Sequence, residues 1–320
     1  MVGCFYQGSA FANGFQVNIK CDICKLRSLS ILIKKLTMKT QFIKNFLTTG
    51  GLIVLSGLLL CGYSQSIRLQ YKYPAGRAIK YVTDTKIVQD MDVNGQSMLV
   101  NIGRYMGCEV KAAGNIAQNI KLEIKIDSIE QNVESPQGTA GGNITEVKGK
   151  SFNIVITPAG KVVDLSEASK IVYTIEGSGE ASLGNEFLNF FPSLPDKEMK
   201  PGDTWVSNDT LDSKTENNTV WMQVESTFKF EGIDNINGVD CAKLTATLSG
   251  SRKMTTQAQG MEIHTSGPFT GTETLVFAIK EGYFVKESVS TKMTGNLEIP
   301  DQNMSFPVVM SVNSTNEIVK

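Results

Sequence analysis

Histidine is almost missing from this sequence, because the 320 residues include only one, His264. A Ser-His-Asp or Cys-His mechanism would have to use that residue. No Gly-x-Ser-x-Gly segment supplies a nucleophile for it, and neither histidines nor a cysteine cluster provides the ligands of a zinc site. We interpret His264 as a strand residue that faces solvent or a neighbouring strand, and we predict no metal site and no cofactor.

Motifs for binding phosphate or nucleic acid are missing too. The chain has no glycine-rich phosphate loop, and no Lys/Arg-rich run follows residue 65. Residues 1–65 hold seven of the 31 Lys and Arg and one of the 32 Asp and Glu, so the remainder carries a net charge of about −7. We predict a protein that is not an enzyme and does not bind nucleic acid. A hydrolase using paired carboxylates remains a remote alternative, because such pairs meet in space rather than in sequence.

Cysteines are few in this sequence, and beyond the N-terminal region there are only two, Cys108 and Cys241. In an oxidising compartment these two would form one disulfide, or they would stay as two separately buried thiols, and the sequence leaves both open. Near the N-terminus, Cys21 and Cys24 form a lone Cys-x-x-Cys pair. Because no second pair accompanies them, they do not predict a zinc or redox site.

Residues 38–65 have the three parts of a secretory signal peptide. Two lysines follow Met38, an apolar run covers Leu52–Leu60, and small residues come next. The run is shorter than the ~20 residues that span a membrane. We therefore expect export to the periplasm or the outer membrane of a Gram-negative bacterium. Because a signal peptide should begin a chain, we interpret residues 1–37 as a leader from a misplaced start.

The cleavage site leaves two alternatives. Leu58–Cys61 resembles a lipobox, which would leave Cys61 lipidated and would be the protein's only link to a membrane. However, Leu60 is larger than the small residue that a lipobox prefers before its cysteine. Cleavage after Ser64 or Gln65 by the ordinary signal peptidase fits the sequence better.

Alternation with period two dominates the chain from Ser66 onward, and Lys121–Asp127 is the clearest case. Apolar residues on one side and charges on the other indicate a half-buried antiparallel strand. Asn94-Gly95 and Pro158-Ala159-Gly160-Lys161 predict hairpin turns, and Glu281-Gly282 predicts another. Further strands are predicted over Trp221–Phe230, Ala242–Leu248, Thr272–Ile279 and Tyr283–Met293, with Met304–Ile318 closing the sheet.

Helix is scarce. Leu165–Tyr173 predicts one short helix with Ser166 as its N-cap, and Gly184–Phe191 predicts another that Pro192 ends. Both helices would cover an open face of the sheet. Gly138–Gly142 is interpreted as a flexible loop.

The densest proline cluster, Phe190–Val206, lies midway along the β region. Pro192 and Pro195 fix φ, lack a backbone donor and disfavour helix in the preceding residue. We expect this stretch to run extended over the surface as a hinge. Pro201-Gly202-Asp203 predicts a turn, after which Thr204-Trp205-Val206 begins a strand.

This stretch carries a family resemblance. Pro192 to Pro195 reads Pro-x-Leu-Pro, and Gly202 to Trp205 reads Gly-Asp-Thr-Trp. The combination resembles a motif of exported, β-rich proteins of Bacteroidota-type bacteria, many of them lipoproteins, and Gly160–Val163 is also similar to that family. The resemblance spans roughly residues 66–320 and implies no catalytic residues. More distantly, such proteins look like lipoprotein-carrier half-barrels, which hold acyl chains in a curved sheet.

An internal repeat is predicted from glycines at near-constant offsets of 122 to 126 residues. The matched pairs are Gly76 with Gly202, Gly114 with Gly238, Gly138 with Gly260, and Gly160 with Gly282. We therefore predict a mainly β fold, with curved antiparallel sheets or one half-barrel built from two related repeats. The first repeat would cover residues 66–175, a helix and the hinge 176–200, and the second repeat 201–320.

Aromatic residues are the remaining candidates for a site. An apolar cavity between a curved sheet and its covering helices would bind a hydrophobic ligand, although the same rings would equally fill a core. The candidate ligand-binding residues are Phe187, Phe190, Phe191, Trp205 and Trp221, accompanied by Tyr71, Tyr73 and Phe228. We predict an envelope protein that binds an apolar small molecule or a lipoprotein partner. The alternative is a structural or interaction protein without a ligand site.

Overall fold

The computed structural model describes residues 66–319 except 177–178, 215–217 and 259. The predicted leader, the signal peptide, the lipidation candidate Cys61 and the pair Cys21 and Cys24 lie outside the described residues.

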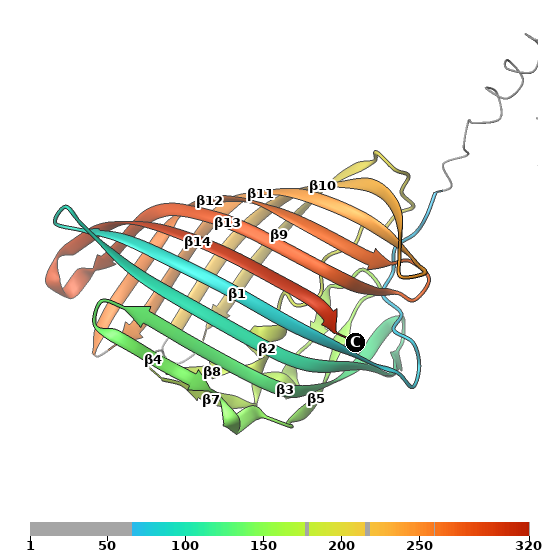
Figure 1. Cartoon of the computed structure of the whole chain (residues 1–320), viewed down its shortest axis with the longest axis horizontal. Coiled ribbons are helices and arrows are strands. Elements are labelled where there is room, and N and C mark those ends of the chain that lie inside the picture. The colour runs from blue at the N-terminus through green and yellow to red at the C-terminus, as the bar shows by residue number, and fades with distance from the viewer. Residues whose placement is uncertain (1–65, 177–178, 215–217, 259, 320) are drawn as a thin grey trace, which may run out of the picture. The chain divides into compact units, whose positions relative to one another are not determined.

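Twelve strands form one curved antiparallel sheet, in the order β6-β5-β3-β2-β1-β14-β13-β12-β11-β10-β9, with β4 added beside β3 (Figure 1). The first group of strands is β1 (Ala78–Val93), β2 (Gln96–Ile116), β3 (Asn119–Ser135), β4 (Gly138–Asn143), β5 (Ser151–Ile156) and β6 (Val162–Asp164). The second group is β9 (Thr204–Lys214), β10 (Asn218–Ile236), β11 (Val239–Ala258), β12 (Met261–Ala278), β13 (Tyr283–Ile299) and β14 (Met304–Val319). The predicted mainly β class is confirmed.

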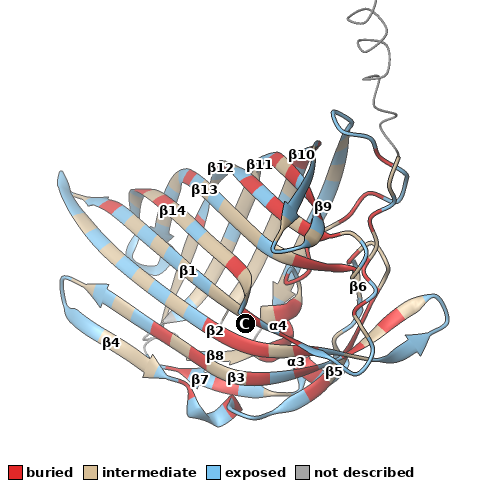
Figure 2. Cartoon of the chain, turned by 45° about the vertical axis from the view of Figure 1, so that its right-hand side comes forward, coloured by how far each residue is buried: buried red, intermediate tan, exposed pale blue. Residues whose placement is uncertain are grey.

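The segment between these groups carries the smaller elements. They are α3 (Ser166–Ser169), the hairpin of β7 (Val172–Ile175) and β8 (Gly179–Ser182), and α4 (Leu183–Phe187). Two 3-10 turns, η2 (Thr145–Val147) and η3 (Pro300–Gln302), follow β4 and β13. Figure 2 shows α3 and α4 inside the curve of the sheet.

Alternation explains why the sheet has a buried face. In β3, Ile120, Leu122, Ile124 and Ile126 are buried, and the residues between them are more exposed. Successive side chains of a strand point to opposite faces, so one apolar phase lies on the concave side. The strand predicted from Lys121–Asp127 is confirmed.

Turns that favour positive φ join the long strands. Asn94 and Gly95 have φ values of 54° and 83°, and Val93 pairs with Gln96 across them. This is the two-residue hairpin that an Asn-Gly sequence predicts, since both positions need positive φ.

The last strand joins the two groups, because β14 pairs with β1 over Lys80–Met91. The prediction that the C-terminal tail closes the sheet is therefore confirmed, and all twelve strands share one sheet rather than two. The second group is an antiparallel meander, and Gly202, Gly238, Gly260 and Gly282 precede its strands or join them in turns. Gly76 and Gly160 of the first group also lie in turns, whereas Gly114 lies within β2 and Gly138 is the first residue of β4. The duplication itself stays a prediction.

The proline stretch does not run over the surface as expected. Phe191, Leu194 and Met199 are buried, and Met199 pairs with Ile67 in an isolated bridge. The prolines exclude regular structure but not burial, because the backbone groups that they leave free bond to other segments. One example is the bond from Leu194 N to the carbonyl of Ala159, at 2.9 Å.

Three smaller expectations also need correction. The helix predicted over Leu165–Tyr173 is the single turn α3, and the chain then turns into β7. Its N-cap is Leu165 without a side-chain bond, while Ser166 donates its backbone N–H to the Asp164 carboxylate at 2.9 Å. Gly138–Gly142 is not a loop but most of β4, because its backbone pairs with β3.

Buried apolar residues form two main clusters along the concave face. At what we call the filled end, α4 and the proline stretch pack on the sheet, and the cluster includes Tyr81, Ile124, Phe187 and Phe284. At what we call the open end, a smaller cluster lies on the strands alone. Its buried members are Met91, Phe269, Met293, Val308 and Met310.

Candidate functional site

Five of the eight candidate aromatic residues meet at the filled end. The ring centroids of Phe187 and Phe190 lie 4.9 Å apart, those of Phe190 and Phe191 5.0 Å, and those of Tyr71 and Phe191 5.8 Å. Tyr73 stacks on Tyr71 at 6.2 Å. All five are buried, so these rings pack on one another as a core.

The other three candidates lie elsewhere. Trp205 stacks on Phe228 with centroids 4.9 Å apart and planes within 8°, in a separate small cluster. Trp221 is half-buried on β10, with the Lys253 ammonium 5.7 Å from its ring centroid. The structure therefore does not bring the eight candidates together around one cavity.

The motif residues act in the scaffold. The Tyr71 hydroxyl donates to the Pro192 carbonyl at 2.9 Å, and Pro195 is buried. Gly202, at φ 93°, donates its N–H to the Phe230 carbonyl at 2.7 Å, and Phe230 donates its own N–H to the carbonyl of Asp203 at 2.9 Å. The turn thus aligns β9 beside β10.

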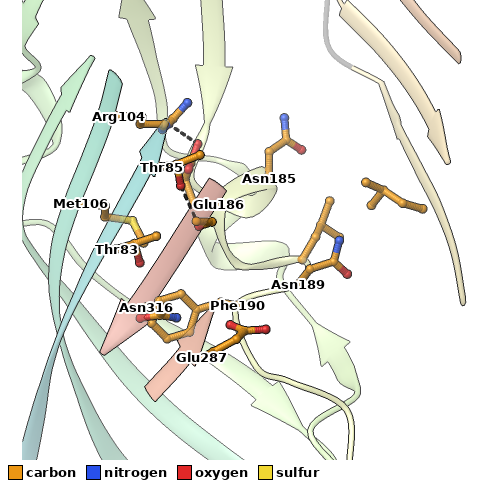
Figure 3. Close-up of a pocket in the computed structure, with 13 residues that line it drawn as sticks. Thr83, Thr85, Arg104, Met106, Asn185, Glu186, Asn189, Phe190, Glu287 and Asn316 are labelled. Carbon is orange, nitrogen blue, oxygen red and sulfur yellow. Dashed lines mark hydrogen bonds and ion pairs between the residues drawn. The ribbon is translucent and has the colours of Figure 1, made fainter. Parts of the chain in front are cut away.

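A polar pocket of about 240 Å³ lies between α4 and the concave face (Figure 3). It is lined by Thr83, Thr85, Arg104, Met106, Asn185, Glu186, Leu188, Asn189, Phe190, Leu211, Glu287, Ser314 and Asn316. Thr83 Oγ1, Asn316 Oδ1 and Arg104 Nε are buried without a hydrogen-bond partner in the described protein. A polar hollow of this size with several free polar atoms suits ordered water.

An ion pair holds α4 over this pocket. Arg104 Nη2 of β2 donates to Glu186 Oε1 at 2.5 Å and to the Tyr173 hydroxyl at 2.7 Å. The Tyr173 hydroxyl in turn donates to Glu186 at 2.7 Å. Burial lowers the pKa of Arg104, but the Glu186 carboxylate and Tyr173 outweigh it, so the pKa is raised overall. The charge of Arg104 is therefore matched within the protein.

Two glutamates lie near each other on the same face, Glu287 in the lining of this pocket and Glu273 on the neighbouring strand β12. Glu287 of β13 pairs with Leu275 of β12, which places Glu273 two residues along on the facing strand. Burial, and secondly the Asp209 carboxylate, raise the pKa of Glu273 to about 7. Burial, and secondly Glu273, raise the pKa of Glu287 well above its ordinary value. Crowded carboxyl groups out of water favour their neutral forms.

An apolar groove of about 250 Å³ continues the concave face toward the open end. Five adjacent strands, β10 to β14, supply its lining: Met222, Val224, Leu248, Arg252, Phe269, Val289, Thr291, Met293, Met310 and Val312. Val289 and Val312 stand two residues from Glu287 and Ser314 of the polar pocket, on the same faces of β13 and β14. The two hollows are therefore neighbours in one trough.

Among the described residues that line the groove, Arg252 is the one that carries a charge. Its Nη1 lies 3.7 Å from Met310 Sδ and its Nη2 3.6 Å from Met254 Sδ. Its Nε is buried without a hydrogen-bond partner. Burial lowers its pKa, and among the described residues no carboxylate forms an ion pair with it.

The cysteines and the histidine build no site of their own. Cys108 and Cys241 are free and buried, so the disulfide alternative does not hold. Burial raises the pKa of both thiols, which makes them poor nucleophiles. His264 lies on β12 with its Nε2 2.5 Å from Glu262 Oε1. In the described part of the chain, no group of three or more His, Cys, Asp or Glu is placed to hold a metal.

Sequence reasoning missed Arg252, Glu273 and Glu287, although a signal for them exists. Arg252 occupies the phase of β11 that buries Leu244, Ala246 and Leu248. Glu273 likewise shares a phase with the buried Leu275 and Phe277 of β12. A charged residue in the apolar phase of a strand would have identified these positions without any coordinates.

Comparisons with known proteins find no family model and no curated protein that matches. A protein described as exported, with a YmcC-like fold, from Bacteroides fragilis matches 79% of this chain and 100% of its own at 9% identity and TM-score 0.22. OccK2 of Pseudomonas aeruginosa, solved with glucuronate, matches 78% of this chain and 100% of its own at 5% identity and TM-score 0.25. DynF from the dynemicin biosynthesis pathway of Micromonospora chersina matches 79% of this chain and 85% of its own, at 6% identity and TM-score 0.23. Similarity this low carries no argument about function.

Proposed function

We propose that this chain is an exported, non-enzymatic protein that binds an apolar ligand in the groove at the open end of its curved sheet. The observation that carries the proposal is the groove itself, whose lining includes none of the proline stretch and is supplied by five strands. Apolar hollows with few polar groups are the usual form of a site for a hydrophobic ligand. Five of the eight aromatic residues first considered for this role pack into the filled end instead, and Trp205, Phe228 and Trp221 are not among the residues that line the groove.

A hydrolase is the weaker reading of the same face. Glycoside hydrolysis by paired carboxylates needs one of them ionised as nucleophile or base. The pKa values of Glu273 and Glu287 are both raised. This favours the neutral form of each carboxyl and leaves neither as the ionised nucleophile or base. A purely structural role gives no reason for an apolar groove that the described chain leaves open.

Export follows from the signal sequence, residues 38–65, and a lipid anchor at Cys61 would tie the protein to a membrane. In the described part of the chain, no helix is long and apolar enough to cross a bilayer. We propose a location in the periplasm or at the outer membrane of a Gram-negative bacterium, with a small hydrophobic molecule as ligand. A lipoprotein partner would present an acyl chain to the same groove.

Calorimetric titration with 1-decanol tests the proposal, because this ligand offers one alkyl chain and no charge. We expect binding to the native protein and at least a tenfold loss in Val289→Trp, which fills the groove. Val88→Trp is the matched control, since Val88 lies exposed on β1 and its phase faces away from the groove. The proposal fails if the native protein does not bind decanol or if Val289→Trp binds it equally well.

A further inference from the structure

Two half-buried arginines on the concave face, Arg104 and Arg252, have opposite surroundings. Arg104 has the Glu186 carboxylate at 2.5 Å, whereas Arg252 contacts two thioether sulfurs and pairs with no carboxylate of the described residues. A thioether sulfur is a weak acceptor, and an arginine is not deprotonated in proteins. Arg252 therefore keeps a positive charge in an apolar setting, where an uncompensated charge is costly.

From this we infer that the groove binds a long-chain carboxylate, with the carboxylate paired to the Arg252 guanidinium and the alkyl chain lying along the apolar floor. The inference rests on the proposed function and names its ligand class. An arginine presents a planar fork of donors that matches a carboxylate with two parallel hydrogen bonds. The sulfur contacts of Nη1 and Nη2 are long enough to give way to such a partner.

The strands leave a path for the arginine side chain. Arg252 of β11 pairs with Gly267 of β12, and a Cβ built on Gly267 would lie 2.8 Å from the Cα of Gly295 on β13. Gly295 in turn pairs with Val308 of β14. Two neighbouring strands therefore place no side chain in the row that starts at Arg252. This lets the guanidinium lie across the sheet and reach Met310.

The charges along the groove set the direction of the ligand. Leu248 lies four residues from Arg252 on β11, roughly 13 Å along the strand. Beyond Leu248, Ala246 pairs with Glu273, so that end of the groove adjoins the acidic pair. A ligand carboxylate is attracted to the positive charge of Arg252, whereas the acidic pair at the other end offers it no cation. The alkyl chain therefore runs from Arg252 over Phe269 toward Leu248 and Val289.

The volume of the groove argues for a ligand with one alkyl chain rather than two. The groove holds about 250 Å³, below the ~300–1,000 Å³ of sites for drug-sized ligands. A single alkyl chain of moderate length suits this volume, and a two-chain lipid does not. Decanoate is therefore the probe, with 1-decanol as its uncharged partner.

The test compares both probes on three proteins by calorimetry. We expect the native protein to bind decanoate more tightly than decanol. Arg252→Met should lose about tenfold or more in decanoate affinity, since hydrogen bonds to charged groups are among the stronger ones, and should bind decanol at least as well as the native protein. Lys253→Met is the matched control because it removes the same charge from the next residue, on the opposite face, and should leave both affinities unchanged.

Each outcome decides a different question. Equal loss of decanoate binding in Arg252→Met and Lys253→Met would show a general charge effect and overturn the inference. Decanoate binding unchanged in Arg252→Met, or decanol bound more tightly by the native protein, would overturn it as well while leaving the apolar site intact. If neither probe binds the native protein, the proposed function fails first.

A measurement on the native protein guards against misfolding of Arg252→Met. The carboxyl carbon of ¹³C-labelled decanoate reports its own ionisation by NMR. Bound beside a guanidinium, the carboxylate should stay ionised to lower pH than in water. A bound carboxyl that titrates at the same pH as free decanoate, or at a higher one, would overturn the pairing with Arg252.

Discussion

The filled end and the open end belong to one sheet, yet their concave faces are completed in different ways. At the filled end α4 and the proline stretch lie in the curve, so Phe187 and Leu194 occupy the hollow as a core. At the open end neither α4 nor the proline stretch lines the hollow, and the apolar groove supplied by strands β10 to β14 remains. The same curvature therefore makes a core where the chain supplies a filling and a binding groove where it does not.

The two arginines of the concave face differ in a similar way, in whether the described chain supplies a carboxylate partner. At the filled end, Arg104 is matched by Glu186 of α4. At the open end no segment of the described chain brings a carboxylate to Arg252. What α4 supplies to one arginine, a ligand would supply to the other.

The largest expected effect comes from removing a ring at each end. Phe187→Ala, at 0% exposure, should lower the free energy of unfolding by about 3–5 kcal/mol, because a closed cavity remains. Phe269→Ala, at 8% exposure on the groove floor, should cost only about 1.5–3 kcal/mol, since the groove widens instead. Urea denaturation of both variants measures the difference, and equal losses would break the comparison.

Two glycines with similar φ values, Gly160 at the filled end and Gly95 in an exposed turn, test how tightly the filled end is packed. Gly160 has φ 88°, and a Cβ there would lie 2.6 Å from the Tyr71 ring and 2.7 Å from the Pro192 carbonyl. Gly95 has φ 83° and nothing within 4 Å. Positive φ destabilises both alanine variants. Gly160→Ala should lower the free energy of unfolding by about 1–3 kcal/mol more than Gly95→Ala, because it also disturbs the packing of the filled end. Equal losses of thermal stability in the two variants would show that the proline stretch packs loosely around Gly160.

The acidic pair between the two ends predicts a pH dependence. The pKa of Glu273 is raised to about 7, whereas an unfolded glutamate titrates near ~4.3. The folded state thus binds the extra proton, and its stability advantage is full below pH ~4.3 and lost as the pH rises to about 7. Glu273→Gln should flatten this slope and raise stability at pH 8 relative to the native protein, on the order of 1–3 kcal/mol.

Urea denaturation at several pH values between pH 4 and 8 measures this slope. Glu225→Gln, on the exposed phase of β10, is the control and should leave it unchanged. A native-like slope in Glu273→Gln would mean that Glu273 is better hydrated than its position indicates.

The smallest expected effect concerns one hydrogen bond, between the segment that precedes β1 and the proline stretch. Tyr71→Phe removes the hydroxyl that donates to the Pro192 carbonyl and should cost about 1–2 kcal/mol, because the carbonyl is left buried without a donor. Tyr105→Phe, which is exposed on β2, should change stability by less than ~0.5 kcal/mol. The comparison loses support if both tyrosines behave alike in chemical denaturation.

Sequence patterns predicted most of the fold and little of the site. The Asn94-Gly95 turn, the β3 alternation and the C-terminal closing strand depend on neighbours in sequence or on a repeating phase, and these were predicted correctly. The burial of Phe190, Phe191, Leu194 and Met199 was not predicted, because prolines restrict the local backbone and do not indicate what the chain packs against. The same limit explains why eight aromatic residues were expected to line one cavity, although five of them pack as a core and the other three lie elsewhere.

By itself, the sequence determined that this chain makes long antiparallel strands with one apolar face, since side-chain alternation and turn chemistry act over a few residues. Only the tertiary structure decided which part of that face became core and which became groove. That choice depends on where a distant segment, the α4 and proline stretch, comes to lie, and on which charges it brings. Arg104 and Arg252 both lie on this concave face, and only the folded structure shows that Glu186 pairs with Arg104 while no carboxylate of the described residues pairs with Arg252.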